Sequence, residues 1–356
     1  MPRVHGQDLE RSGTEVFAAL GAPREEAQWV STLLVRSNLR GHDSHGVLRI
    51  PQYVEAIRAG QIRPGERPGV EERGPTTLVV DGRLGFGQVV AREAMALAVG
   101  RARAHGVAAV GIRRANHVGR LADFAEQAAA EGVVGLVFAN DSGALQRVAP
   151  AGGIEGRLST NPFAVGIPRR TPPHLVVDVS TSVVASGKLK AARDAGERVP
   201  EGWVQDAQGR PSTDPNVPFA DPPGTILPMA GHKGYALALV VEVLAGVLSG
   251  AGFVRPDPGP DYQGAFLVAL DVSRFLPLDR FVADVEAMLA HVKSARPRPG
   301  VPEVLVPGEH AWKEAERRKV EGIPLAEGTW AKLRAIAEAL GVPLPAPVGP
   351  RGGAGS

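Results

Sequence analysis

Apolar strand patterns alternate with helix patterns between residues 77 and 138. No other feature of the sequence limits the possible fold classes as much. Strand patterns occupy 77–82, 107–112 and 133–138, and helix patterns occupy 88–105 and 119–131. Apolar strands that alternate with helices are typical of α/β proteins, in which helices cover the sheet. The sequence therefore predicts an α/β fold with a largely covered sheet.

The rest of the chain follows other patterns. Residues 7–40 and 51–58 have the periodicity of amphipathic helices, and 60–75 is a connection rich in Pro and Gly. Beyond residue 150 the sequence predicts short strands at 163–167, 175–179 and 265–270, and helices at 234–248, 279–293 and 329–339. Because 234–248 is strongly apolar, we expect this helix to be buried on most sides.

Charge and composition argue against several classes of protein. The 40 Lys and Arg residues nearly balance 38 Asp and Glu, so no strong field favours nucleic acid or an anionic membrane surface. Cys is absent, which excludes disulfides, thiolate nucleophiles and Cys-based metal sites. The first ten residues do not form a signal peptide and no run of 18 apolar residues occurs, so we expect a cytoplasmic protein.

Candidate chemistry is concentrated in residues 41–49, Gly-His-Asp-Ser-His-Gly-Val-Leu-Arg. His42 and His45 carry imidazoles, the side chains best suited to accept and return a proton near neutral pH. Arg49 offers a planar fork that matches the two oxygens of a carboxylate. The segment has the groups needed to move a proton and hold a carboxylate, although a solvated polar turn between two helices would have the same composition.

A glycine pattern at Gly85 and Gly87 follows a strand and opens a helix, as in a Rossmann dinucleotide site. The third small residue is missing because position 90 is Val90, and Arg113 and Arg114 stand where an acidic residue is expected. The pattern therefore favours a tight turn into a helix. The sequence contains no P-loop motif either.

Six patterns, taken in order, resemble those of the type-2 malate/L-lactate dehydrogenase family. They are 38–46 with Arg49; 116–119; 150–153 with 160–162; 178–182 with 187–188; 231–235; and, more weakly, 307–309. Together they span roughly residues 8–340. Ser159 stands where the family usually has Gly, and Val179 and Ser180 stand where Met and Ala are common. Both departures are conservative in size.

The resemblance implies a nicotinamide-linked dehydrogenase that forms a homodimer, with its active site near the interface. It also implies an α/β fold with a mixed, largely antiparallel sheet in a non-Rossmann cofactor domain, plus a helical domain built from both chain ends. We expect the helical, dimerisation and substrate-side domain at 1–70 with 275–342. The α/β core is expected at 75–274, with the dinucleotide region at about 120–274, and a flexible tail at 343–356.

Hydride transfer to a small acid needs a proton donor and a carboxylate anchor. The resemblance assigns the proton to His45 or His117, of which we favour His45, and Arg49 suits the carboxylate. Ser44 could bind the substrate or fix the tautomer of His45. Lys233 is one of seven Lys in an Arg-rich chain, which suggests a point-charge role, and the resemblance implies that it belongs to the cofactor or substrate site.

The resemblance also implies a set of cofactor-binding residues. These are Asp141, Thr160, Asn161, Pro162, Asp178, Ser180, Thr181, His232, Lys233, Gly234, Pro307, Gly308 and Glu309. The expected cofactor is NAD. NADP stays open, because Lys190 and Arg193 could bind its additional phosphate.

The expected substrate is a small 2-hydroxy or 2-oxo acid, malate or lactate. The alternative is a ureidoglycolate dehydrogenase or an NADPH-dependent reductase of the C=N bond of a cyclic imino acid, because protonating an amine nitrogen resembles protonating an alkoxide. A ligand-binding protein without catalysis would be expected to lack at least one of His45, His117 and Lys233. We expect no metal, since His42 and His45 have no third ligand at a useful spacing.

Overall fold

The computed structural model describes residues 1–257, 259 and 261–348. It divides into two compact units, unit 1 with residues 1–65 and 309–356, and unit 2 with residues 66–308. The sequence placed the second boundary near 275 instead of 308. The difference arises because helix α8 (Leu278–Lys293) buries Val285 and Leu289 against Leu175 and Val306, which belong to unit 2.

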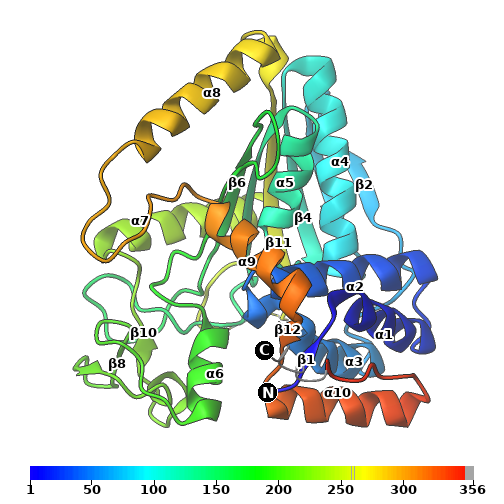
Figure 1. The fold of residues 1–356 in the computed structure, drawn as a ribbon, viewed down its shortest axis with the longest axis vertical. Coiled ribbons are helices and arrows are strands. Elements are labelled where there is room, and N and C mark those ends of the chain that lie inside the picture. Colours follow the sequence, from blue (N-terminus) through cyan, green and yellow to red (C-terminus); the bar gives the residue numbers. More distant parts are fainter. Residues whose placement is uncertain (258, 260, 349–356) are drawn as a thin grey trace, which may run out of the picture. The chain divides into compact units, whose positions relative to one another are not determined.

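Unit 1 is helical and draws its elements from both ends of the chain (Figure 1). They are β1 (Arg3–Val4), α1 (Gly6–Ala19), α2 (Arg24–Leu39), the 3-10 turns η1 (Asp43–His45) and η2 (Val47–Arg49), α3 (Ile50–Arg58), α9 (Glu309–Glu321), β12 (Ile323–Pro324) and α10 (Glu327–Leu340). Strand β1 pairs antiparallel with β12, which joins the two ends of the chain.

The expected flexible tail begins in contact with unit 1. The Ser12 hydroxyl donates to the Pro343 carbonyl at 2.8 Å, and the Val348 N–H donates to the Arg3 carbonyl at 2.7 Å. The N-terminal segment therefore holds residues 343–348, and residues 349–356 lie outside the described part of the chain.

Unit 2 is built on a seven-stranded sheet in the order β2-β3-β4-β11-β5-β6-β7. Its strands are β2 (Gly69–Glu72), β3 (Thr77–Asp81), β4 (Val107–Ala115), β5 (Val133–Asn140), β6 (Phe163–Ile167), β7 (Leu175–Val179) and β11 (Gln263–Asp271). Strands β3 and β4 are parallel, and the other neighbours in this sheet are antiparallel. This confirms the predicted mixed, largely antiparallel sheet.

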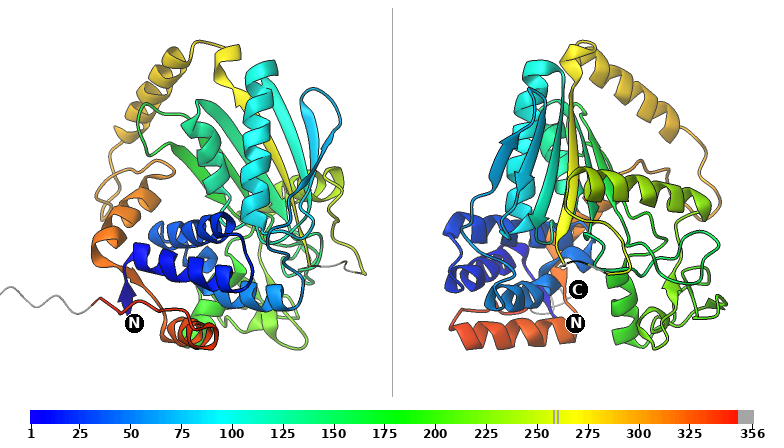
Figure 2. Two further views of the ribbon diagram at one scale, coloured as in Figure 1. Left: turned by 90° about the vertical axis from the view of Figure 1, so that its right-hand side faces the viewer. Right: turned by 180° about the vertical axis from the view of Figure 1, so that it is seen from behind.

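Helices cover both faces of this sheet (Figure 2). Helices α4 (Gly87–His105) and α5 (Ala122–Ala130) cover one face, and α7 (His232–Val241) continues into the π-helix η4 (Glu242–Leu248) on the other. The α7–η4 helix buries Ala238, Val241 and Ala245 but leaves a row of apolar side chains exposed, namely Leu237, Leu239, Val240, Val243, Val247 and Leu248. The expectation that this helix is buried on most sides is therefore wrong for the single chain.

A smaller subdomain of unit 2 has its own core. It contains α6 (Ser186–Ala195), the three-stranded sheet β10-β8-β9 and the turn η3 (Val217–Phe219); the strands are β8 (Val204–Gln205), β9 (Pro211–Ser212) and β10 (Thr225–Ile226). Leu189, Val204 and Ile226 are fully buried together in this core. The turn η5 (Val272–Arg274) links β11 to α8.

Candidate active site

In unit 1, residues 41–49 fold into two short turns, η1 and η2, which run directly into α3. The side chain of Asn38, buried at the end of α2, organises both turns. Its Oδ1 accepts the Val47 N–H at 2.8 Å, and its Nδ2 donates to Asp43 Oδ1 at 2.6 Å. A Cβ on Gly46 would lie 2.2 Å from Asn38 Oδ1, so only glycine fits there.

The turns bring Ser44, His45 and Arg49 together. Ser44 Oγ lies 2.9 Å from His45 Nδ1, where it can fix the tautomer of the ring. Arg49 Nε donates to the Ser44 carbonyl at 2.8 Å, and Arg49 Nη1 donates to Gln52 Oε1 at 2.7 Å. The guanidinium is therefore anchored on one edge to the turn that carries the imidazole.

Arg49 has no carboxylate partner among the residues that the structure describes. Burial lowers the pKa of Arg49, and the nearby Tyr53 offsets this only in part. A guanidinium partly removed from water without a counter-charge is costly.

Asp43 is held by a second residue, Arg318 of α9. Arg318 Nη1 donates to Asp43 Oδ1 at 2.6 Å and Nη2 donates to Oδ2 at 3.0 Å, a bidentate pair. Arg318 Nη1 also donates to the Asn38 carbonyl at 2.7 Å, and Arg318 Nε donates to Glu314. Burial lowers the pKa of Arg318, but its bonds to Asp43 and Glu314 raise it above the usual value overall.

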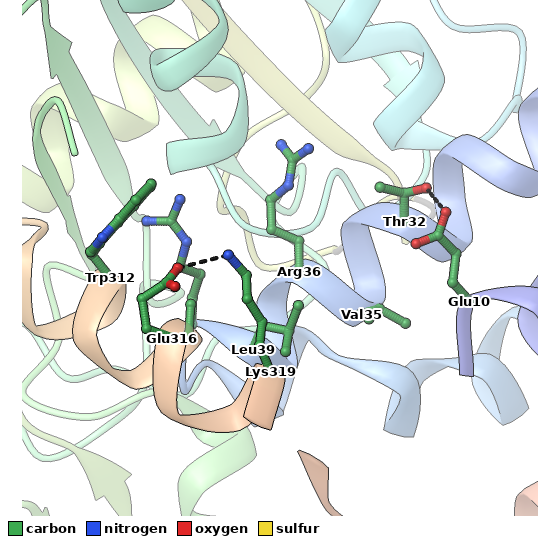
Figure 3. A pocket seen from close by; sticks show the side chains of 10 residues that line it. Glu10, Thr32, Val35, Arg36, Leu39, Trp312, Glu316 and Lys319 are labelled. Atoms are coloured by element: carbon green, nitrogen blue, oxygen red, sulfur yellow. Dashed lines mark hydrogen bonds and ion pairs between the residues drawn. The ribbon is translucent and has the colours of Figure 1, made fainter. Parts of the chain in front are cut away.

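A groove of about 190 Å³ separates parts of α2 and α9 (Figure 3). Apolar side chains form part of its wall, and Trp312 lies beneath two cations: Arg40 is 5.0 Å and Lys319 5.8 Å from the ring centre. Lys319 also pairs with Glu316 at 2.7 Å.

In unit 2, the register of the sheet collects the other predicted site residues at one edge. Phe138 near the end of β5 pairs with Phe163 at the start of β6, and Phe163 pairs with Val179 at the end of β7. The start of β11 pairs with the ends of both β4 and β5. The segments beyond these strand ends carry His117, Asp141, Thr160, Asn161, Pro162, Ser180 and Thr181.

The loop that carries His117 is anchored on both sides. Asn116 Nδ2 donates to the carbonyls of Leu84 and Gly85, and the Val118 N–H donates to Gln263 Oε1 at 2.9 Å. A Cβ on Gly87 would lie 2.0 Å from the Asn116 carbonyl oxygen. Gly87 is therefore the residue that lets α4 approach the His117 loop, which explains the glycine pattern that resembled a Rossmann site.

Asp178 stabilises the end of this loop, where α5 begins. Its Oδ2 accepts the Ala122 N–H at 3.0 Å, at the start of α5, and the buried Arg120 lies beside it and bonds Asp123 at 3.0 Å. Burial raises the pKa of Asp178 to about 6, with Asp123 and Glu126 adding to the rise, although Arg120 and the Ala122 N–H oppose it. Asp178 was predicted to bind cofactor, but both of these partners belong to the protein.

Asp141, just beyond β5, is buried and neither of its carboxylate oxygens has a hydrogen-bond partner among the described residues. Burial raises its pKa to about 7; the negative charges of Glu242 and Asp261 act in the same direction, and Ser159 and the Gly143 N–H oppose them. Glu242 itself accepts from Asn161 Nδ2 at 2.8 Å and from the Val254 N–H at 2.8 Å. The Ser159 hydroxyl and the Gly143 N–H are thus near this buried carboxyl but do not make hydrogen bonds of normal geometry to it.

Other predicted cofactor residues use their polar groups within the protein. The Thr181 hydroxyl donates to the Thr160 carbonyl at 3.0 Å, the Ser180 hydroxyl donates to the Ser182 carbonyl at 2.7 Å, and Asn161 Nδ2 donates to the Ala238 carbonyl at 3.0 Å. These bonds join the 160–162 and 180–182 segments to each other and to α7. The side chains therefore hold the loops together, and their contact with a ligand stays a prediction.

The remaining predicted residues lie on two surfaces. His232 and Lys233 are exposed at the first turn of α7, whereas Gly234 is buried beneath it. The Pro307 carbonyl accepts the Val176 N–H at 3.3 Å, which places the 307–308 segment alongside β7, the last strand of the sheet. Glu309 is the first residue of α9 and belongs to unit 1.

No cluster of three or more His, Asp or Glu side chains in the described part of the chain could hold a metal ion. Among residues 1–257, 259 and 261–348, no helix has both the length and the apolar content to cross a bilayer.

Comparison with known proteins gives a match over nearly the whole chain. The family model described as malate/L-lactate dehydrogenase matches residues 4–334. The L-lactate dehydrogenase of Cupriavidus necator is 39% identical over 338 residues, which cover 93% of this chain and 96% of that protein.

Two solved structures show the same fold at full length. Malate dehydrogenase from Pyrococcus horikoshii OT3 superposes with a TM-score of 0.86 at 32% identity, over 96% of both chains. The delta1-piperideine-2-carboxylate reductase of Pseudomonas syringae superposes with a TM-score of 0.82 at 28% identity, over 95% of this chain and all of that one. From the extent of the family match and the identity to its relatives, the chain belongs to the malate/L-lactate dehydrogenase family.

Proposed function

We propose that this protein transfers a hydride between a nicotinamide dinucleotide and a small 2-hydroxy or 2-oxo acid of the malate or lactate type. The observation that carries the proposal is Arg49, a half-buried guanidinium without a carboxylate partner among the described residues. The carboxylate of a 2-oxo acid supplies the charge and the planar pair of oxygens that this fork lacks. Substrate binding then removes the cost of the isolated cation.

His45 is proposed to exchange the proton at the substrate oxygen. The bond between Ser44 and His45 Nδ1 orients the ring, and the exchange is proposed at Nε2. Arg49 is bonded to the same turn, so the carboxylate anchor and the proton donor share one rigid segment. His117 stays the alternative donor, on a loop that is equally well anchored.

Residues at the sheet edge of unit 2 are proposed to hold the dinucleotide, which supplies the hydride. Asp141 fits this role, because neither of its buried oxygens makes a hydrogen bond of normal geometry within the described residues, and the carboxamide and ribose of a dinucleotide offer several donors. We favour NAD over NADP. Of the two cations considered for a second phosphate, Lys190 and Arg193, Arg193 lies over the ring of Phe219, at 5.2 Å from its centre.

The protein is also proposed to be a homodimer through the exposed apolar row of α7–η4. Val240, Val243 and Leu248 are each at least half exposed in the single chain. A row of that kind on one helix marks an interaction surface, and a second copy of the chain supplies a complementary apolar face. A cytoplasmic location stays a prediction.

The test is a substrate panel with a His45 variant. Purified protein is assayed with NADH and NADPH against pyruvate, oxaloacetate and a cyclic imino acid. We expect NADH oxidation with the 2-oxo acids, and a fall in kcat of roughly 10²–10⁴-fold for His45→Asn. His42→Asn, in the same turn, is the control and should retain wild-type turnover.

Three results would redirect the proposal. Turnover of the imine alone would establish the alternative C=N reductase, in line with the fold shared with a piperideine carboxylate reductase. Full activity of His45→Asn together with loss in His117→Asn would transfer the proton step to His117. An unchanged KM for the 2-oxo acid in Arg49→Gln would remove Arg49 as the anchor.

A further inference from the structure

Arg318 reaches the candidate catalytic turn from a distant part of the chain. It lies 275 residues from Asp43, on α9, and its side chain is only 9% exposed. Its guanidinium makes two parallel bonds to the Asp43 carboxylate, which immediately precedes Ser44 and His45. An arginine buried against a carboxylate in this geometry is pre-organised, because the planar fork allows one relative orientation.

The contacts form a closed network. Arg318 Nη1 bonds both Asp43 and the Asn38 carbonyl, and Asn38 Nδ2 bonds the same oxygen of Asp43. The turn η1 has only three residues and no side-chain cap at its start, so little within it fixes its own shape. The Asp43–Arg318 pair therefore ties the turn to α9.

We propose that Asp43 and Arg318 are positioning residues that hold the Ser44–His45 turn in the shape required for proton transfer. The inference rests on the proposed role of His45, but neither residue touches a substrate or reacting atom in this assignment. Loss of the pair would let the turn shift while leaving the sheet edge of unit 2 unchanged. A displacement of about 1 Å at a catalytic group costs on the order of 10²-fold in rate.

The experiment compares Arg318→Met and Arg318→Lys with Arg317→Met. Arg317 is the matched control, because it pairs with the same Glu314 but its other partner is the exposed Glu321. We expect kcat to fall about 10–100-fold in Arg318→Met and by less in Arg318→Lys, which keeps the charge but not the fork. Arg317→Met should stay within about twofold of wild type, a small effect typical of exposed ion pairs.

Two readouts separate positioning from mere loss of stability. The dissociation constant for NADH, measured by fluorescence, should stay within about threefold of wild type in every variant. Hydrogen exchange of the backbone amides at 43–49 should be faster in Arg318→Met and unchanged in Arg317→Met. If Arg318→Met does not fold, Arg318→Lys and Asp43→Asn provide the same comparison.

Specific outcomes would overturn the inference. Wild-type kcat in a folded Arg318→Met, with His45→Asn inactive, would reject the positioning role and leave the proposed function intact. A parallel loss of NADH binding and kcat would show a general structural role instead. If His45→Asn is fully active, the proton assignment fails, whereas faster exchange at 43–49 in Arg318→Met would still show that Arg318 holds the turn.

Discussion

At the scale of residues, each unit contains one ionisable group whose surroundings disfavour its charge. Burial lowers the pKa of Arg49 in unit 1 and raises that of Asp141 in unit 2. Groups with such shifted pKa values are more frequent at functional sites. We expect an acid substrate to supply a counter-charge to Arg49 and a dinucleotide to supply donors to Asp141.

Asp141 should make the stability of the protein depend on pH. Its pKa is raised from 3.8 to about 7 in the folded chain, so the folded state holds a proton that the unfolded state releases above pH 4. Stability from this group is fully present below about pH 4 and is lost as pH rises to about 7. The shift of about three pKa units sets an upper limit on the order of 4 kcal/mol.

Asp141→Asn removes that loss, because the amide stays neutral at every pH. We expect the variant to unfold at a higher temperature than wild type at pH 8 and at a similar temperature at pH 4, measured by calorimetry without ligand. Asp178, whose pKa is also raised, keeps part of the pH dependence in both proteins. A variant that is less stable than wild type at pH 8 would mean that Asp141 is ionised and satisfied in the folded state.

At the scale of elements, the approach of α4 to the His117 loop depends on one glycine. A Cβ at Gly87 would lie 2.0 Å from the Asn116 oxygen and 2.6 Å from the His117 carbonyl carbon, so Gly87→Ala must displace the backbone of that loop. We expect Gly87→Ala to lower the free energy of unfolding by several kcal/mol, measured in urea, and to reduce kcat.

Gly100 is the control within the same helix. A Cβ there meets nothing within 4 Å, so Gly100→Ala should stabilise the protein by about 0.5–1 kcal/mol through helix propensity. If the two substitutions have equal effects, the crowding at Gly87 is relieved by adjustments that do not reach His117.

Some helices and strands could be predicted from the sequence, and others could not. Strands β6 and β7 were predicted to the residue, because short apolar runs between Pro and Gly turns have few alternatives. Helix α9 was missed, since its sequence EHAWKEAERRKVE has few apolar positions to show a helical period. Arg318 was missed with it, because a bond across 275 residues leaves no local pattern.

The order of the strands in the sheet could not be predicted from local sequence patterns either. The β-α-β rhythm from 107 to 140 would suit parallel neighbours, but β11 enters between β4 and β5 and runs antiparallel to both. Only the family resemblance implied a largely antiparallel, non-Rossmann sheet. Residues 41–49 were identified from chemistry alone, yet the roles of Asn38 and Asp43 in shaping that turn required the coordinates.

At the scale of the whole molecule, the α7–η4 helix would link the proposed assembly to the predicted cofactor loops. Its buried side holds Asn161 and Glu242 beside the sheet edge, and its other side carries the exposed apolar row. A partner chain that covers the row would also stabilise the helix on which the predicted cofactor loops depend. Assembly and cofactor binding are therefore expected to be coupled through one element.

Charges placed in that row should dissociate the proposed dimer. Val243 and Val247 are 53% and 54% exposed in the single chain, so Val243→Glu and Val247→Glu cost little in the monomer but bury an unpaired carboxylate in a dimer. We expect sedimentation velocity to show a dimer for wild type and monomer for the double variant, with weaker NADH binding in the monomer. Val320→Glu, at a 61% exposed position on α9, should stay dimeric. A wild-type monomer would reject the proposed dimer. A dimeric double variant would show that the dimer uses another surface, since a glutamate pair cannot stay buried without a counter-charge.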